Sequence, residues 1–135
     1  MSKTSNIYTI NKNVCPTGWN GPTDAEWTVL TDYLGGDSIA GDKMKEVGTI
    51  SWNNPNTWDS RYTDATNTSL FTALPGGASD YGDDSNDLGK FGYWWSSTER
   101  SQASAWIRGL AYNDQSAYRE GLDKRQGLSV RCLRD

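Results

Sequence analysis

The sequence contains no histidine, and its 135 residues include only two cysteines, two phenylalanines and two methionines. Without histidine, the chain lacks the commonest general base, the usual zinc ligand and any Ser-His or Cys-His nucleophile pair. No apolar run approaches the ~20 residues that a membrane-spanning helix needs. Residues 1–13 are polar and lack the apolar core of a secretory signal. These absences argue against histidine-dependent catalysis and against direct membrane insertion.

The composition that remains is typical of one loop-rich domain. The net charge is −4, so nucleic acid is not an expected partner. Seven Trp and seven Tyr supply large apolar areas although only 35% of the residues are hydrophobic, and fourteen Gly indicate many turns. The length fits a single domain. We expect residues 1–14 to form an N-terminal segment with a possible first strand at 7–10, and residues 15–135 to form the domain.

The clearest helix signal begins at Thr23. Thr23 and Glu26 have the spacing of a capping box. Three apolar residues then share one helical face: Trp27, Leu30 and Leu34. The glycine pair Gly35 and Gly36 follows, as at many helix ends. Residues 37–48 indicate a short helical turn that leads into an extended piece at 43–45.

Strand signals dominate the last third of the chain. Residues 93–98, 105–112, 117–122 and 128–133 are predicted to form a run of antiparallel strands. A helix near the start of the chain followed by a run of strands at its end is typical of an α+β domain. We therefore expect one or two helices packed on small antiparallel sheets, with long surface loops.

Residues 106–113 alternate in character along one predicted strand. One side carries bulky residues and suits a half-buried face: Trp106, Arg108, Leu110 and Tyr112. The other side mixes types that no single solvent or core environment would select: Ile107, Gly109, Ala111 and Asn113. A regular strand with such a face is typical of a recognition surface.

Two further groups of residues are weaker candidates for binding. Four aspartates lie close in sequence and could ligate calcium through their carboxylate oxygens: Asp80, Asp83, Asp84 and Asp87. Their spacing is not that of an EF-hand, because the twelfth position counted from Asp83 is Trp94 rather than Glu. A solvated loop is the simpler interpretation. Asparagines beside Trp52 and Trp58 could hold a sugar, although such tryptophans more often anchor a loop.

The two cysteines, Cys15 and Cys132, lie near opposite ends of the chain. A bond between them would close almost the whole chain and stabilise it by up to ~4–5 kcal/mol; the alternative is two buried free thiols. No pair of carboxylates and no phosphate-binding loop stands out. We expect a protein without catalytic activity.

Six ordered motifs resemble a known family. They are CPTGW at 15–19, PTDAEW at 22–27, LGG at 34–36, FTALPGG at 71–77, GYWWSSTE at 92–99 and SVRC at 129–132. Together they resemble the Fibrobacter succinogenes major paralogous domain, common in surface proteins of Bacteroidetes and relatives. The resemblance covers residues 15–135 and implies a C-type lectin-like fold, in which paired terminal strands would bring Cys15 and Cys132 together in a disulfide. It also implies an extracellular place, on a bacterial cell surface or a phage particle.

The C-terminal segment is also similar to the variable region of proteins targeted by diversity-generating retroelements. In those systems adenines of a template repeat are mutagenised, so some codons scatter while others stay fixed. By this resemblance the fixed residues are Ala105, Trp106, Arg108, Leu110, Tyr112, Arg119, Lys124, Gly127 and the run 129–132. The diversified, ligand-binding residues are Arg100, Ser101, Ser104, Ile107, Gly109, Ala111, Asn113, Asp114, Ser116, Tyr118, Glu120, Gly121, Leu122, Asp123, Arg125 and Gln126.

These observations predict a non-catalytic recognition domain that binds a protein or another cell-surface receptor through residues 100–126, with no required cofactor. One alternative is a carbohydrate-binding surface module that uses residues 52–58, with calcium bound at residues 80–87. Another is an enzyme related to formylglycine-generating proteins, which would need a reactive cysteine pair in a cleft.

Overall fold

A computed structural model describes residues 14–47, 64–80 and 85–135. The elements there are β1 (Trp19–Asn20), α1 (Asp24–Tyr33), α2 (Asp37–Met44), β2 (Ala78–Ser79), β3 (Ser85–Asn86), β4 (Phe91–Glu99), β5 (Ser104–Ala111), β6 (Ala117–Asp123) and β7 (Leu133–Arg134). The described part is α+β, with two helices and small antiparallel sheets, as predicted. The strand expected at 7–10, the sugar-binding loop at 52–58 and the aspartates Asp83 and Asp84 lie outside the described residues.

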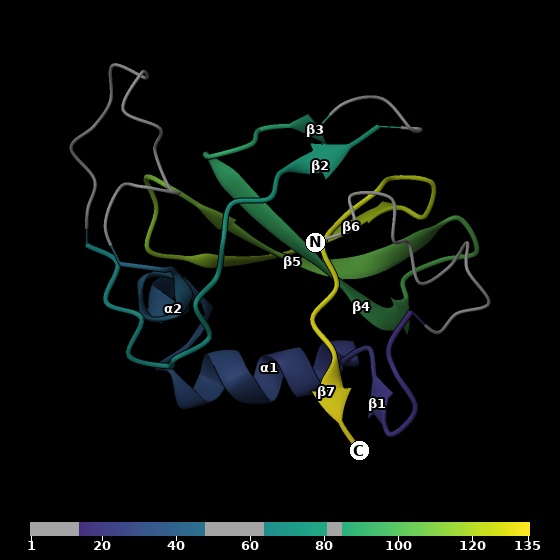
Figure 1. The fold of residues 1–135 in the computed structure, drawn as a ribbon, viewed down its shortest axis with the longest axis horizontal. Coiled ribbons are helices and arrows are strands. Elements are labelled where there is room, and N and C mark those ends of the chain that lie inside the picture. Colours follow the sequence, from purple (N-terminus) through teal and green to yellow (C-terminus); the bar gives the residue numbers. More distant parts are fainter. Residues whose placement is uncertain (1–13, 48–63, 81–84) are drawn as a thin grey trace.

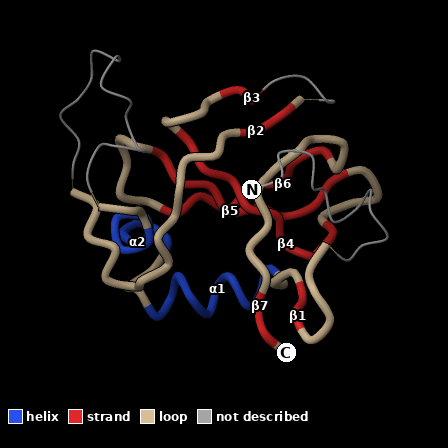
Figure 2. The backbone as a smooth tube through the Cα atoms, viewed as in Figure 1, coloured by secondary structure: helices blue, strands red, loops and turns tan. Residues whose placement is uncertain are grey.

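The main sheet has the order β4-β5-β6 and occupies the middle of the domain. Figure 1 shows α1 and α2 on one side of this sheet and the β2–β3 pair on the other. The short β1 pairs with β7, which places the segment after Cys15 beside the C-terminus. The tube view of Figure 2 shows how much of the chain between these elements is loop.

Helix α1 begins as its capping box predicted. The Oγ1 atom of Thr23 accepts a hydrogen bond from the backbone N–H of Glu26 at 3.1 Å, and the backbone N–H of Thr23 donates to Oε2 of Glu26 at 2.8 Å. The predicted apolar face is confirmed, because Trp27 and Leu34 are buried and Leu30 packs beside them. This first core also contains Met44, Trp94, Leu110 and Ala117.

Helix α2 is longer than predicted. The prediction of an extended piece at 43–45 is wrong for residues 43 and 44, because α2 continues through Met44. Only Lys45 is extended, and it forms a β-bridge to Ala73. The helix contains Gly41, a poor helix former. A Cβ atom at Gly41 would clash with the carbonyl oxygen of Ser116, so close packing of α2 against the β5–β6 loop explains the glycine.

The last predicted strand is also corrected. Residues 128–133 were expected to be a strand of the antiparallel run, but Ser129 makes only an isolated parallel bridge to Trp94, and β7 begins at Leu133. The backbone there still bonds to β4, from Trp95 N to Ser129 O at 3.1 Å and from Ser129 N to Tyr93 O at 3.0 Å. This segment therefore covers part of the sheet without extending it.

The register of the main sheet separates its side chains into two faces. The helix face, which packs on α1 and α2, carries Gly92, Trp94, Trp106, Arg108, Leu110, Ala117, Arg119 and Gly121. The distal face, on the side of β2 and β3, carries Phe91, Tyr93, Trp95, Ile107, Gly109, Ala111, Tyr118, Glu120 and Leu122. The alternation read from residues 106–113 is thus the alternation of the central strand.

A second core covers one end of the distal face. Trp95, Ala105, Ile107 and Leu128 are buried together, with Val14, Ala78, Leu122 and Val130 packed around them. Ile107 is 0% exposed and Ala111 is 1% exposed. The expectation that these two side chains stand exposed on the recognition face is therefore wrong. Ile107 is covered by the segment around Leu128 and by Ala78 of β2. The other end of the distal face is open.

Candidate functional site

The open end of the distal face contains a cavity that we call the Gly109 hollow. It has a volume of about 210 Å³ and is lined by Phe91, Tyr93, Ile107, Gly109, Tyr118 and Glu120. All three strands of the main sheet contribute to it. Four of the six residues belong to the set predicted to bind ligand, and the buried Ile107 forms part of the lining.

Gly109 creates the hollow because it has no side chain. It pairs with Tyr93 on β4 and with Tyr118 on β6, so a tyrosine flanks it on each side. A Cβ atom here would lie 3.2 Å from Cδ1 of Tyr93 and 3.6 Å from Cδ2 of Tyr118. Any side chain at position 109 would therefore fill the space between the two rings.

The walls of the hollow are aromatic and held in place. The rings of Phe91 and Tyr93 stack, with centroids 5.9 Å apart and planes at 9°. The hydroxyl of Tyr118 donates a hydrogen bond to Oδ2 of Asp114 at 2.7 Å. Asp114 in turn accepts from the backbone N–H of Ser116 through Oδ1 at 2.7 Å. These contacts fix the orientation of both tyrosines before any ligand arrives.

A buried lysine supports the loop that carries Asp114. The ammonium of Lys45 donates to the backbone carbonyls of Ala111 and Asp114, each at 2.8 Å, and pairs with Oδ1 of Asp42 at 3.0 Å. Burial lowers the pKa of Lys45, and the neighbouring Asp42 opposes that shift. The predicted binding residues Asp114 and Ser116 thus belong to a loop anchored on α2, and Asn113 is exposed beside them.

A second cavity adjoins the first and shares two of its residues. This Gln126 hollow, of about 230 Å³, is lined by Ala78, Asp80, Asp87, Tyr93, Glu120, Leu122 and Gln126. Nε2 of Gln126 donates to Oδ1 of Asp80 at 2.7 Å. Glu120 lies at the boundary, since it lines both cavities. Three residues of the predicted binding set therefore continue the site from Gly109 toward β2: Glu120, Leu122 and Gln126.

The electrostatic environment of the site is negative. Burial raises the pKa of the Tyr93 hydroxyl to about 12, with further contributions from the carboxylates of Asp87 and Glu120. Burial also raises the pKa of Tyr118 to about 12, and the hydrogen bond to Asp114 adds to the shift. The hydrogen bonds from Ser116 and Tyr118 hold the pKa of Asp114 below its usual range. Both tyrosines are therefore neutral hydrogen-bonding groups at physiological pH.

Three predicted binding residues lie away from the hollows, on the helix face or at its edge. Gly121 faces the helix side, and a Cβ atom there would clash with Cδ of Arg100. Arg100 lies 5.5 Å from the ring centre of Trp106, and Ser104 shares that face. The structure thus divides the predicted set between two sides of the sheet.

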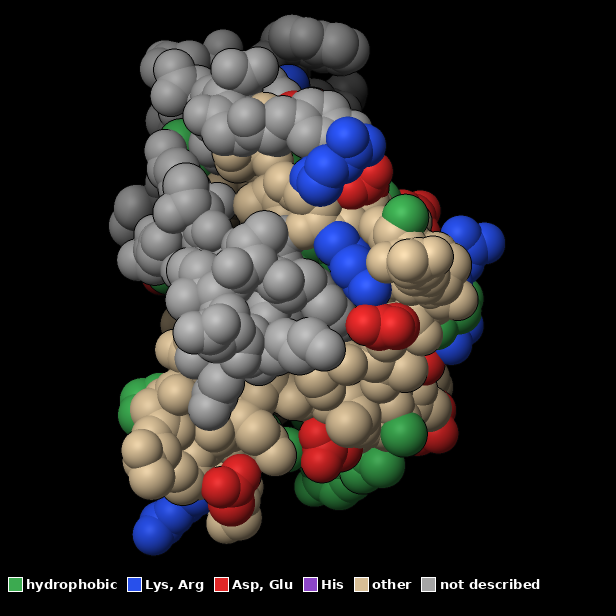
Figure 3. Space-filling view, turned by 90° about the vertical axis from the view of Figure 1, so that its right-hand side faces the viewer, with side chains coloured by type: hydrophobic (Ala, Val, Ile, Leu, Met, Phe, Trp, Pro, Cys, Tyr) green, Lys and Arg blue, Asp and Glu red, His purple; other side chains and the backbone are tan. Residues whose placement is uncertain are grey.

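The remaining predicted residues occupy the turns at one end of the sheet. Ser101 and Ser104 hydrogen-bond through their hydroxyls at 2.8 Å, and Arg125 pairs with Asp123 at 2.8 Å. The turns are tied together by Lys124, which donates to the carbonyl of Gln102 at 3.0 Å and pairs with Glu99. Figure 3, which looks at the domain from the right-hand side of Figure 1, shows acidic and basic side chains interspersed over the described surface.

Two of the residues expected to be fixed, Arg108 and Arg119, connect the main sheet to α1. Arg108 is 1% exposed, and its Nη1 donates to Oδ1 of Asp24 at 2.6 Å while Nη2 donates to Oγ1 of Thr28 at 2.9 Å. Arg119 donates to Asp24 through Nη2 at 2.7 Å and lies 3.6 Å over the ring of Trp106. One carboxylate at the start of α1 therefore holds two strands of the binding sheet.

The disulfide implied by the family resemblance is present. Cys15 and Cys132 are bonded, with their Cα atoms 5.8 Å apart and 117 residues between them in sequence. They are the only cysteines of the chain, so neither supplies a free thiol. The bond lies beside the β1–β7 pair and closes both ends of the domain onto each other.

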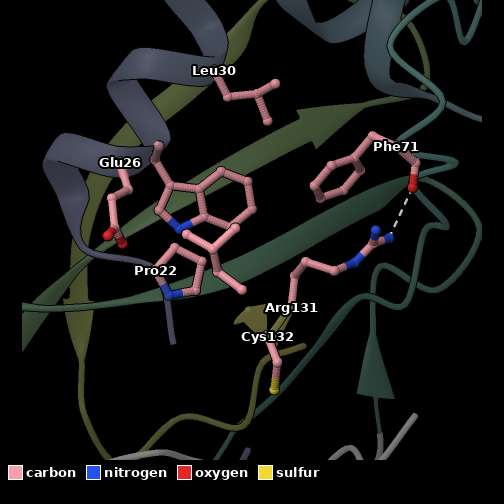
Figure 4. Close-up of a pocket in the computed structure, with 8 residues that line it drawn as sticks. Pro22, Glu26, Leu30, Phe71, Arg131 and Cys132 are labelled. Atoms are coloured by element: carbon pink, nitrogen blue, oxygen red, sulfur yellow. Dashed lines mark hydrogen bonds between the residues drawn. The ribbon is translucent and has the colours of Figure 1, made fainter. Parts of the chain in front are cut away.

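A further cavity lies between α1 and the C-terminal segment (Figure 4). It measures about 290 Å³ and is lined by Pro22, Glu26, Trp27, Leu30, Phe71, Arg131, Cys132 and Leu133. Its two charged groups already have partners, because Glu26 caps α1 and Arg131 donates to the carbonyl of Phe71 at 2.9 Å while stacking 3.9 Å over that ring. We interpret these contacts as structural interactions that hold the helix, the 71–77 segment and the C-terminus together.

Of the aspartates proposed for calcium, Asp80 and Asp87 lie in the described region. Asp80 accepts the hydrogen bond from Gln126, and Asp87 lines the same hollow. Within residues 14–47, 64–80 and 85–135, no group of three or more acidic or cysteine side chains is placed to hold a metal ion.

Five residues that line the hollows were not among the predicted ligand-binding residues: Phe91, Tyr93 and Ala78, and Asp80 and Asp87, which were considered only for calcium. Period-two alternation from Trp95 back to Phe91 is the signal that could have found the two aromatic residues.

Residues 2–134 match the model of a family described as the Fibrobacter succinogenes major domain. No curated protein and no solved structure matches the chain. In the described segments, no helix is both long and apolar enough to cross a membrane.

Proposed function

The chain belongs to the Fibrobacter succinogenes major domain family, and from this premise we propose that it is a non-catalytic recognition domain. Its ligand is a protein or another cell-surface receptor, bound at the distal face around the Gly109 hollow. The observation that carries the proposal is this preorganised aromatic hollow, whose lining includes Gly109, Tyr118 and Glu120 from the set assigned to ligand binding. Rigid tyrosines are side chains that often carry binding energy at interfaces.

A C-type lectin-like fold is part of the proposal. Three features support it: the terminal strands pair, a disulfide joins the ends of the chain, and helices cover one face of a sheet whose other face carries loops. The disulfide also supports a place outside the cytosol, because such bonds persist in oxidising compartments. We propose a bacterial cell surface or a phage particle.

Diversification by a retroelement is the second part of the proposal. Trp106, Arg108 and Leu110, assigned as fixed, project to the helix face. Gly109, Tyr118 and Glu120, assigned as variable, surround the open hollow on the opposite face. A sheet divided in this way permits substitution on one face at small cost, since exposed positions outside special contacts usually change stability by less than ~0.5 kcal/mol.

The binding function can be tested with arrays of bacterial surface proteins and of glycans, probed with the labelled full chain. We expect a protein target whose binding is lost in Tyr118→Ser and Glu120→Arg. Binding should be unchanged in Tyr33→Ser, which alters an 85% exposed tyrosine on α1, and unchanged by a calcium chelator. Chelator-sensitive glycan binding that ignores Tyr118 and Glu120 would instead support the carbohydrate-binding alternative.

A further inference from the structure

The two hollows contain carboxylates without partners among the described residues. Glu120 lines both cavities and Asp87 lines one, and neither side chain makes a hydrogen bond or ion pair with another described residue. The other acidic groups nearby are engaged: Asp114 by Tyr118, and Asp80 by Gln126. Glu120 and Asp87 therefore have free acceptor capacity at the place where a ligand would enter.

Aromatic rings surround this negative charge. Phe91 and Tyr93 stack on one side of Gly109, and Tyr118 lies on the other. The face of an aromatic ring carries negative electrostatic potential and attracts cations, and the attraction grows when the cation is desolvated. Among the described residues that line the two hollows, none is Lys or Arg. The site thus combines ring faces and carboxylates with no basic group to neutralise them.

We propose that the Gly109 hollow binds the cationic head group of a lysine or arginine side chain presented by the protein partner. The inference deepens the recognition function proposed above and rests on it. In this arrangement the head group lies between Tyr93 and Tyr118, and the carboxylate of Glu120 accepts its hydrogen bonds. A volume of about 210 Å³ equals the liquid share of roughly seven water molecules, which is room for a head group but not for a folded segment.

The position of Glu120 suits this role. Glu120 is exposed and lines both hollows. It pairs with Ile107 in the sheet, so its backbone is fixed while its carboxylate is free. Asp87 supplies a second negative charge from the residues before β4. The raised pKa of Tyr93, to which both carboxylates contribute after burial, reports the same negative environment.

The test is an NMR titration of the ¹⁵N-labelled full chain with N-acetyl-lysine methylamide and N-acetyl-arginine methylamide, and with N-acetyl-norleucine methylamide as the neutral control. We expect saturable shifts at the amides of Gly109, Tyr93 and Glu120 with the cationic probes only. The probe with the lower Kd identifies the preferred head group. Glu120→Gln keeps the shape and removes the charge, so it should raise the Kd about fivefold, as expected for the loss of one solvent-exposed ion pair.

Asp32→Asn is the matched control, because it removes an exposed carboxylate from α1 and should leave the Kd unchanged. Equal shifts with norleucine, no shifts at all, or an unchanged Kd in Glu120→Gln would overturn the inference. If the cationic probes fail but array binding still depends on Tyr118, the cation inference is wrong and the recognition function stands. If array binding ignores both Tyr118 and Glu120, the recognition function itself is wrong.

Discussion

Arg108, in the middle of β5, donates from Nη1 to Oδ1 of Asp24 at 2.6 Å across 84 residues of sequence. Asp24 is also the carboxylate that receives Arg119, so one residue in the first turn of α1 neutralises two arginines of the sheet. Burial alone would raise the pKa of Asp24, but hydrogen bonds from Arg119 and Arg108 outweigh it and hold the pKa below its usual range. The recognition sheet is therefore joined to its supporting helix by charge as well as by packing.

Asp24→Asn should lower the free energy of unfolding by about 3 kcal/mol, because it leaves the buried guanidinium of Arg108 without a counter-charge. Asp32→Asn on the same helix is the control and should change it by less than ~0.5 kcal/mol. A group whose pKa is lowered by folding stabilises the protein above its unfolded pKa of about 4, and that stability is lost as pH falls. Urea unfolding between about pH 2.5 and 6 should therefore show a weaker acid dependence in Asp24→Asn, and identical curves would contradict this role.

Ile107→Ala should destabilise the domain by about 2–4 kcal/mol, because the side chain is fully buried beside Trp95 and Leu128. Leu88→Ala is the comparison, since Leu88 is 62% exposed and its truncation should have little effect. Urea unfolding of both variants measures the difference. A neutral Ile107→Ala would mean that this position is free to vary as an exposed contact, as the sequence first suggested.

The tyrosines of the Gly109 hollow should ionise only at unusually high pH. Absorbance at about 295 nm during alkaline titration is expected to show Tyr93 and Tyr118 ionising near pH 12, well above the ordinary value of about 10. A tyrosine whose pKa is raised by folding stabilises the protein below pH 10, and this contribution is lost as pH rises toward 12. Glu120→Gln should lower both pKa values because it removes a carboxylate that acts on each, while Asp32→Asn should not. Ordinary pKa values in the folded protein would contradict the negative, partly buried environment.

Replacing both cysteines, in Cys15→Ser/Cys132→Ser, should lower the free energy of unfolding by about 5 kcal/mol in the chain-entropy model, because the bond spans 117 residues. The measurement is urea unfolding of the wild type with and without reductant, beside the double variant. Reductant should destabilise only the wild type. Equal stability of oxidised and reduced wild type would show that the terminal segments are held by strand pairing alone.

Local signals in the sequence predicted much of this fold, and long-range packing explains what they missed. Thr23 and Glu26 predicted the start of α1 because a capping box is complete within four residues. The family motifs implied the pairing of Cys15 with Cys132. The length of α2 was not predictable, because Gly41 is favourable there only through its contact with Ser116, far along the chain.

In the candidate site, too, local patterns predicted some features and long-range packing determined the others. The retroelement resemblance supplied Tyr118 and Glu120, and alternation placed Gly109 on the same face as Ile107, since that depends only on the period of a strand. It could not show that Leu128 and β2 bury Ile107 on that same face, or that Gly121 and Arg100 meet on the other. The partners across the sheet, above all Tyr93, depend on register, which no local pattern fixed.

The most direct test of the central claim, that diversified residues surround the hollows while Trp106, Arg108 and Leu110 stay constant, is to sequence the DNA around the gene. The account predicts a reverse-transcriptase gene nearby and a near-copy of the codons for residues 105–132 that differs at adenines. Those differences should fall at the codons of Gly109, Tyr118 and Glu120 and spare those of Trp106, Arg108 and Leu110. A flanking region without such a copy, or with changes at the codons of Trp106, Arg108 and Leu110, would contradict it.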